Sequence, residues 1–269
     1  MALATLPLVL TVIMVELAIG GAFLMWYLDR TGSAPTGFLQ LTAFVNAGAI
    51  AFAGVLLPAL PRGSLVQRAG LDPNALTAFS QVLVVVIVLV IAQLVASFTP
   101  WRAVREVVGI VTVLGGVFDL TLAAIARPAQ SPFDVFALLV LPLGALALGG
   151  ADAAMLLGHW YLVTPKLSAG PLQKAALVLV AAVGLQLILV AIAIARGELS
   201  LGMETAYLVA AGLRIGVGLF MTLAVALAAW WTARMNTQAS TGLLYVGLGC
   251  VLAGEVSARV LFFLTGAAV

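Results

Sequence analysis

Charged residues are scarce in this sequence of 269 residues: they make up 8% of it, whereas hydrophobic residues make up 64%. A soluble globular domain carries about 25% charged residues and about half apolar residues. The mean hydropathy is +1.23, so the composition excludes a water-soluble fold and predicts an integral membrane protein. Twelve Lys and Arg against ten Asp and Glu give a net charge of +2, which is too small to favour a nucleic-acid partner.

Cysteine and histidine are almost missing, with one of each, Cys250 and His159. A single cysteine excludes an intramolecular disulfide, a CxxC redox pair and an all-cysteine iron–sulfur or zinc site within this chain. A haem held by two histidines would need a second one, so neither haem nor metal is expected here. The sequence also lacks a P-loop, a dinucleotide-binding glycine motif, HExxH and a nucleophile elbow, and we expect no chemistry on a soluble substrate.

Long apolar runs account for nearly the whole chain. A bilayer core about 30 Å thick needs about 20 apolar residues per helix, and eight such runs occur: 6–28, 37–60, 75–98, 103–126, 135–163, 175–195, 205–232 and 241–265. The runs are continuous, without strand-type alternation, which favours helices over a barrel. We therefore predict an all-α integral membrane protein, a single membrane domain of eight transmembrane helices that allow two groups of four. The first run lacks a basic leader and is longer than a signal-peptide core, so we expect it to remain uncleaved.

The loops are short, the longest being Pro61–Asn74, and their charges give a weak orientation signal. We call the side of the N-terminus side A and the other side B. Side A holds four cations, Arg62, Arg68, Arg127 and Arg196, and side B holds six, Arg30, Arg102, Arg105, Lys166, Lys174 and Arg234. The positive-inside rule then places side B in the cytoplasm of a prokaryotic cell and both termini outside its inner membrane. All five tryptophans fall at side-B ends of runs, as an interfacial belt would.

Six ionisable residues lie within the runs, where each is costly unless it faces a partner or water. At about 1.5 Å per residue, five of them lie about 10 to 16 Å below side A: Glu16, Asp119, Arg214, Glu255 and Arg259. Glu255 and Arg259 are four residues apart and so share a helix face. We expect them to pair with each other and Arg214 to pair with Asp119. Glu16 would remain unpaired, either neutral or poised to exchange a proton.

Two further polar residues form a possible secondary site nearer side B. Asp152 follows the pair Gly149 and Gly150, where two helices could approach closely, so packing is as good a role for it as function. His159 lies near the side-B end of the fifth run, where a quinone or lipid head group, or an interfacial structural contact, could involve it.

Three runs carry the residue pattern of a known family. The eighth run has Gly254-Glu255, then Arg259, then Phe262-Phe263; the first has Pro7 and Gly20-Gly21 around Glu16; the seventh has Leu213-Arg214-Ile215. This pattern resembles the membrane-anchor subunit of dimethyl sulfoxide reductase and polysulfide reductase over about a third of the chain. The resemblance implies a subunit that binds menaquinone or ubiquinone and exchanges electrons with an iron–sulfur partner. It also implies a molybdopterin or other catalytic subunit, and Glu16, Arg214, Glu255 and Arg259 as the matching positions.

A quinone head group needs hydrogen-bond donors and acceptors within the membrane and a proton path to water. We expect Glu16 to exchange protons, Arg214 to polarise a carbonyl, and Glu255 with Arg259 to hold the pocket, with Asp119 beside them. Two other interpretations stay open: a structural or assembly subunit with only lipid as ligand, and a small transporter. A haem-binding cytochrome subunit would depend on His159 alone.

Overall fold

A computed structural model describes residues 2–32, 34–128, 133–164, 167–199 and 205–269, with side chains from Thr5 onward. Lys166, one of the side-B cations, lies outside these residues. The described chain is built of helices and contains no strand. Eight of its helical segments are long and apolar enough to cross a membrane, which confirms the predicted all-α membrane fold.

The spans follow the predicted runs closely. They are α1 (Ala2–Arg30), α2 (Thr36–Leu56) with the 3₁₀ turn η1 (Leu57–Ala59), α4 (Pro73–Ser97), α5 (Arg102–Ile125), α6 (Val135–Val163), α7 (Gly170–Ala195), α8 (Thr205–Gly212) with η2 (Leu213–Met221) and α9 (Thr222–Thr232), and α10 (Thr237–Thr265). The loop after η1 contains a short helix, α3 (Ser64–Arg68). The start of α10 precedes the apolar run because Asn236 caps it, accepting hydrogen bonds from the backbone N–H groups of Gln238 and Ala239.

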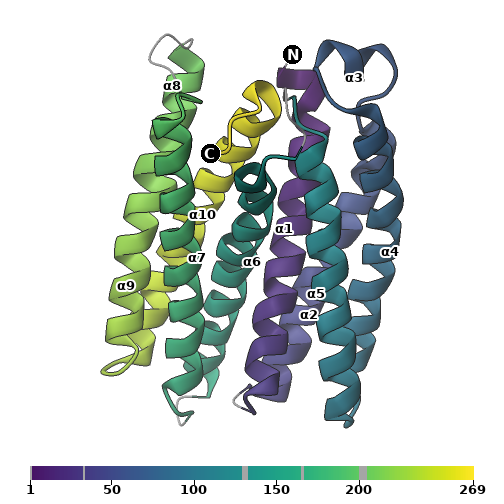
Figure 1. Cartoon of the computed structure of the whole chain (residues 1–269). Helices are drawn as coiled ribbons and strands as arrows, with labels where there is room; N and C mark the ends of the chain where they lie inside the picture. The colour runs from purple at the N-terminus through teal and green to yellow at the C-terminus, as the bar shows by residue number, and fades with distance from the viewer. Residues whose placement is uncertain (1, 33, 129–132, 165–166, 200–204) are drawn as a thin grey trace.

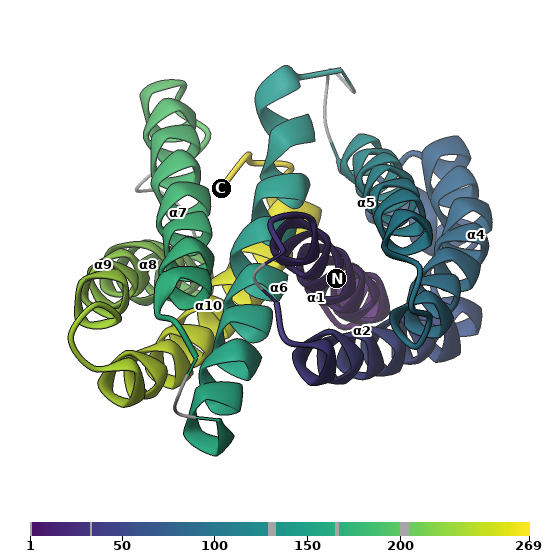
Figure 2. The ribbon, with the colours of Figure 1, turned by 90° about the horizontal axis from the view of Figure 1, so that it is seen from below.

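The spans form two four-helix bundles that stand side by side (Figure 1). In the first bundle α1 contacts α2, α2 contacts α4, α4 contacts α5, and α5 returns to α1. In the second bundle α6, α7, α8–α9 and α10 close a ring in the same order. The bundles meet through α1 and α6, which lie at the centre when the molecule is viewed along its long axis (Figure 2).

Two short sequence motifs occur in both halves. Leu6-Pro7-Leu8 in α1 corresponds to Leu141-Pro142-Leu143 in α6, and Trp26-Tyr27-Leu28 corresponds to Trp160-Tyr161-Leu162. The spacing between the two motifs differs by one residue. Both halves begin on side A and have the same ring order.

Glycines set how closely the two bundles approach. A Cβ atom on Gly20 would overlap the carbonyl oxygen of Ala145, and one on Gly149 would overlap that of Leu17. The backbones of α1 and α6 therefore touch at this crossing, as small residues allow in membrane helices. The predicted close approach at Gly149 is confirmed. Valines on the outer face of α4, among them Val84, Val88 and Val95, are exposed and suit a lipid environment.

Candidate functional site: a buried ion network between the bundles

Glu16 of α1 and Arg259 of α10 join the two bundles by an ion pair. The Nε atom of Arg259 donates to the Oε1 atom of Glu16 at 2.7 Å, and both side chains are completely buried. The same guanidinium reaches Glu255, one turn away on α10, through Nη2 at 2.5 Å. Arg259 thus serves two carboxylates at once, and the predicted pairing of Glu255 with Arg259 is present.

A second arginine completes the charge balance from the seventh span. The Nη1 atom of Arg214 donates to the Oε1 atom of Glu255 at 2.8 Å. The amide of Gln186 on α7 donates to the same oxygen at 2.8 Å. Two glutamates and two arginines therefore form one network of neutral formal charge, which offsets part of the cost of burying each ion.

Glycine residues, which have no side chain, make room for this network. A Cβ atom on Gly144 of α6 would overlap Nη2 of Arg259 and would lie 2.7 Å from Oε1 of Glu16 and 2.9 Å from Oε2 of Glu255. Gly218 of η2 and Gly254 of α10 face each other so closely that a Cβ on either would overlap the other's Cα. The glycines bring α6, η2 and α10 close enough for short ion pairs.

Arg214 lies in an unusual helical segment. The residues Leu213–Met221 form a π-helix within the seventh span, and the hydroxyl of Thr222 donates to the carbonyl of Val217, five residues earlier. Such wide turns within α-helices occur frequently at functional sites. Here the wide turn lies where Arg214 and Gly218 both face α10.

One predicted pairing is wrong, and so is the prediction that Glu16 is unpaired. Arg214 pairs with Glu255 and not with Asp119, because Arg214 belongs to the second bundle and Asp119 lies on α5 of the first. Glu16 is not left over, since it pairs with Arg259. Of the five primary candidates, Asp119 is the one whose side chain has no hydrogen-bond partner among the described residues, and it is fully buried.

The secondary candidates lie apart from the network. Asp152 is buried on α6 and its Oδ2 atom has no partner within the described part of the chain. His159 is exposed near the side-B end of α6, and its Nδ1 atom lies 2.9 Å from the hydroxyl of Tyr245 on α10. The structure therefore brings together four of the five primary candidates, without Asp119, Asp152 or His159.

The network keeps unused hydrogen-bonding capacity. Among the described residues, Oε2 of Glu16, Oε1 of Gln186, Nε of Arg214 and Nη1 of Arg259 have no partner. They are two donors and two acceptors that belong to one network. Two cavities of the bundle lie elsewhere. One of about 420 Å³ lies at side A around α3, and a small one lies at side B among α1, α2, α4 and α5.

The chain matches no protein-family model, no curated protein and no solved structure. The resemblance of three spans to a quinol-reactive anchor subunit thus stays a prediction. Gln186 and Gly144 were missed at the level of sequence. A polar amide inside an otherwise apolar run was a usable signal for Gln186, whereas nothing in the order of residues distinguishes Gly144 from the chain's other glycines.

Proposed function

We propose that this chain is the quinone-binding membrane subunit of a respiratory oxidoreductase complex. In this proposal it exchanges electrons with an iron–sulfur subunit that is joined to a molybdopterin or other catalytic subunit. One observation carries the proposal: Glu16, Arg214, Glu255 and Arg259, the four positions matched by the family resemblance, are the four charged residues that meet in one network. Asp119 and Asp152, which the resemblance does not match, lie outside it.

The chemistry of the four side chains suits this role. A quinone that becomes a quinol takes up two electrons and two protons, and the network holds acidic groups and cationic donors at one depth in the membrane. Arg214 would donate to a head-group carbonyl through its unused Nε atom. Glu16 would exchange protons through Oε2, and Gln186 would fix the position of Glu255. Menaquinone and ubiquinone both fit this donor set, and electrons would pass to the partner subunit.

The proposal includes a location and partners. We place the chain in the inner membrane of a prokaryote, with side B toward the cytoplasm and both termini outside. Since the chain has almost no mass outside its spans, an electron relay has to come from another subunit. Co-purification from the native membrane should recover an iron–sulfur protein with this chain.

Quinone titration of the purified protein tests the proposal. We expect a saturable change in the quinone absorption spectrum that is lost in Glu16→Gln and Arg214→Ala, because each removes a hydrogen-bonding group of the site. Glu106→Gln is the matched control, since Glu106 is a carboxylate at side B bonded to Arg102. Binding that is unchanged in both network variants would exclude this site.

A structural subunit is the second candidate, and the bridging pair favours it. Glu16 and Arg259 come from different bundles, so the network pins the two halves together whether or not a ligand binds. In that case Glu16→Leu would weaken the fold while the complex that survives keeps its full turnover.

A further inference from the structure

The first bundle contains a separate set of buried polar side chains that the ion network does not use. They are Thr42 and Asn46 on α2, Gln93 on α4 and Asp119 on α5, each at most 2% exposed. Within the described residues, the Thr42 hydroxyl, both amide atoms of Asn46, Oε1 of Gln93 and both carboxylate oxygens of Asp119 have no hydrogen-bond partner. Buried polar groups in native proteins are generally satisfied, by ordered water where no side chain reaches them.

The contacts of α1 with α2 and α5 give the height of these residues along the membrane normal. A Cβ atom on Gly109 of α5 would overlap the side chain of Trp26, and one on Gly116 would overlap the side chain of Ile19. Because α1 and α5 run in opposite directions, this register puts Asp119 at the height of residue 16. A Cβ atom on Gly21 would overlap the side-chain oxygen of Asn46, so Asn46 lies about 7 Å closer to side B than Asp119 does.

The same row continues from Asn46 to side B. Thr42 precedes Asn46 by one turn of α2, and the Nε2 atom of Gln93 donates to the carbonyl of Ala22 at 3.3 Å. Gln93 also lines a cavity of about 10 Å³ together with Trp26, Asp29 and Arg105. This volume is enough for about one water molecule.

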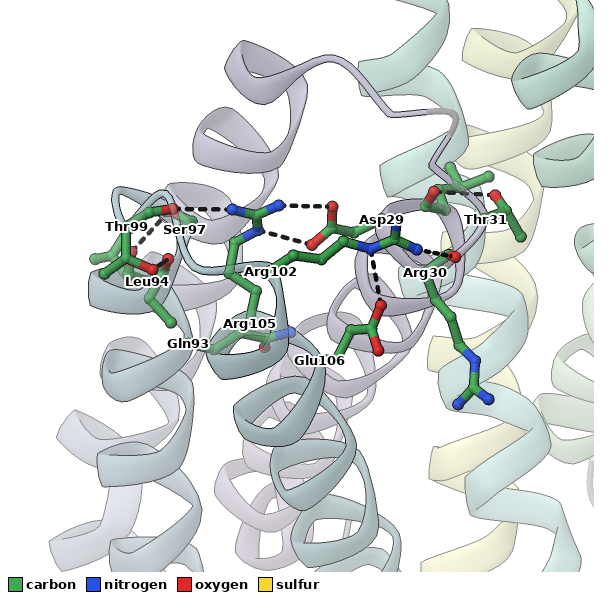
Figure 3. Close-up of polar contacts among 12 residues, drawn as sticks. Asp29, Arg30, Thr31, Gln93, Leu94, Ser97, Thr99, Arg102, Arg105 and Glu106 are labelled. Carbon is green, nitrogen blue, oxygen red and sulfur yellow. Dashed lines mark hydrogen bonds and ion pairs between the residues drawn. The ribbon is translucent and has the colours of Figure 1, made fainter.

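Asp29 and Arg105 form the outer rim of that cavity. Arg105 donates through Nε and Nη2 to the two carboxylate oxygens of Asp29, at 2.8 and 3.1 Å. Figure 3 shows Gln93 beneath this layer of charged residues at the side-B end of the bundle. Polar groups therefore extend from the ionic surface through the water-sized cavity to Gln93, Thr42 and Asn46, and Asp119 lies about 7 Å deeper than Asn46.

Toward side A of Asp119, α5 buries Leu120, Ala123 and Ala124 completely. The same half of the bundle also buries polar residues, Thr11 of α1 and Arg127, which donate hydrogen bonds to the carbonyls of Pro7 and Ala124. The side chains of Thr42, Asn46 and Gln93 lie on the side-B side of Asp119.

We infer that Asp119 is a proton-exchange site connected to side B by a hydrated row of Thr42, Asn46 and Gln93. A proton that enters between Asp29 and Arg105 passes along water and the side chains of the row and bonds to a carboxylate oxygen of Asp119. It leaves by the same path, so that protons and charge balance at each exchange. This inference does not depend on quinone binding, although Asp119 lies at the height of Glu16 and would be placed to serve it.

Infrared spectroscopy of the full chain in membranes tests the inference without any ligand. Transfer from H₂O to D₂O shifts the carbonyl band of a protonated carboxyl group, and the band that disappears in Asp119→Asn belongs to Asp119. We expect this band to shift promptly in the unmodified protein. Thr42→Val, Asn46→Leu and Gln93→Leu should each slow the shift by roughly tenfold or more. Ser240→Ala, which removes a buried hydroxyl from the second bundle, should leave its rate unchanged.

The variants separate the possible outcomes. Thr42→Val keeps the shape of the side chain, so a slow shift in this variant cannot be attributed to a misfolded bundle. The inference is overturned if Asp119→Asn removes no carboxyl band. It is also overturned if the band shifts in all three row variants at the rate of the unmodified protein, or if Ser240→Ala slows it as much as they do.

Discussion

At the scale of single residues, Arg259 is the cation on which the buried ion network depends most. It is completely buried and is the shared partner of Glu16 and Glu255. Breaking a buried ion pair from one side leaves an uncompensated charge, which typically costs about 3–5 kcal/mol. The loss of Arg259 leaves one carboxylate without any cation and the other with Arg214 alone.

This geometry predicts a ranking of stabilities. Arg259→Met should lower the free energy of unfolding by about 3–5 kcal/mol. Glu16→Gln should cost less, because Arg259 keeps Glu255 and the new amide still accepts a hydrogen bond. Chemical unfolding in mixed detergent micelles measures both, with Arg102→Met at the exposed side-B surface as the control. A smaller loss for Arg259→Met than for Glu16→Gln would contradict the network as described.

The sequence predicted which charges matter but not which of them meet. Counting residues along each run placed Glu16, Arg214, Glu255 and Arg259 at one depth, and the structure brings all four together. Asp119 has the same depth yet lies apart. Depth depends only on the rise of a helix, whereas pairing depends on the rotation of each helix about its axis. That rotation is set by packing contacts between distant segments, such as those of Gly218 with Gly254.

At the scale of elements, helix α6 offers a direct test of how glycine positions control the site. Gly144 and Gly150 lie in the same helix, six residues apart. A Cβ atom at Gly144 would overlap Arg259, whereas one at Gly150 would meet nothing within 4 Å. The two positions therefore differ in what surrounds them and not in the residue type.

Gly144→Ala should displace the Arg259 guanidinium and destabilise the protein by about 1–3 kcal/mol, as overpacking does. Gly150→Ala should change the stability by about 1 kcal/mol or less. The same unfolding measurement compares them, and quinone titration shows whether the displacement also weakens binding. Equal effects of the two substitutions would contradict the conclusion that the lack of a side chain at Gly144 makes room for the Arg259 guanidinium.

At the scale of the whole molecule, the sequence predicted the eight spans because a continuous apolar run of sufficient length has few other structures open to it. The number of spans was compatible with two groups of four helices but did not predict that grouping. The shared motifs Leu-Pro-Leu and Trp-Tyr-Leu are too short to decide the grouping, and their spacing differs by one residue between the halves. The contacts between the helices show the two rings directly.

If the two halves are complete four-helix units, the chain should tolerate a cut between α5 and α6. Co-expressed halves should then associate in the membrane and co-purify through a tag on one of them. The contacts between them include the ion pair of Glu16 with Arg259 and the backbone approach of α1 and α6 at Gly20 and Gly149.

Gly149→Leu should reduce recovery of the untagged half by roughly tenfold, equivalent to about 1.4 kcal/mol, because its side chain would force α1 and α6 apart. Gly184→Leu is the matched control, since a Cβ atom at Gly184 of α7 would meet nothing within 4 Å. Arg259→Met should weaken recovery as well, by removing the charge that joins the bundles. Recovery that falls equally in Gly184→Leu would show that added bulk, and not the α1–α6 crossing, limits assembly. Because the crossing lies next to the ion network, its integrity decides whether residues from both halves can form one site.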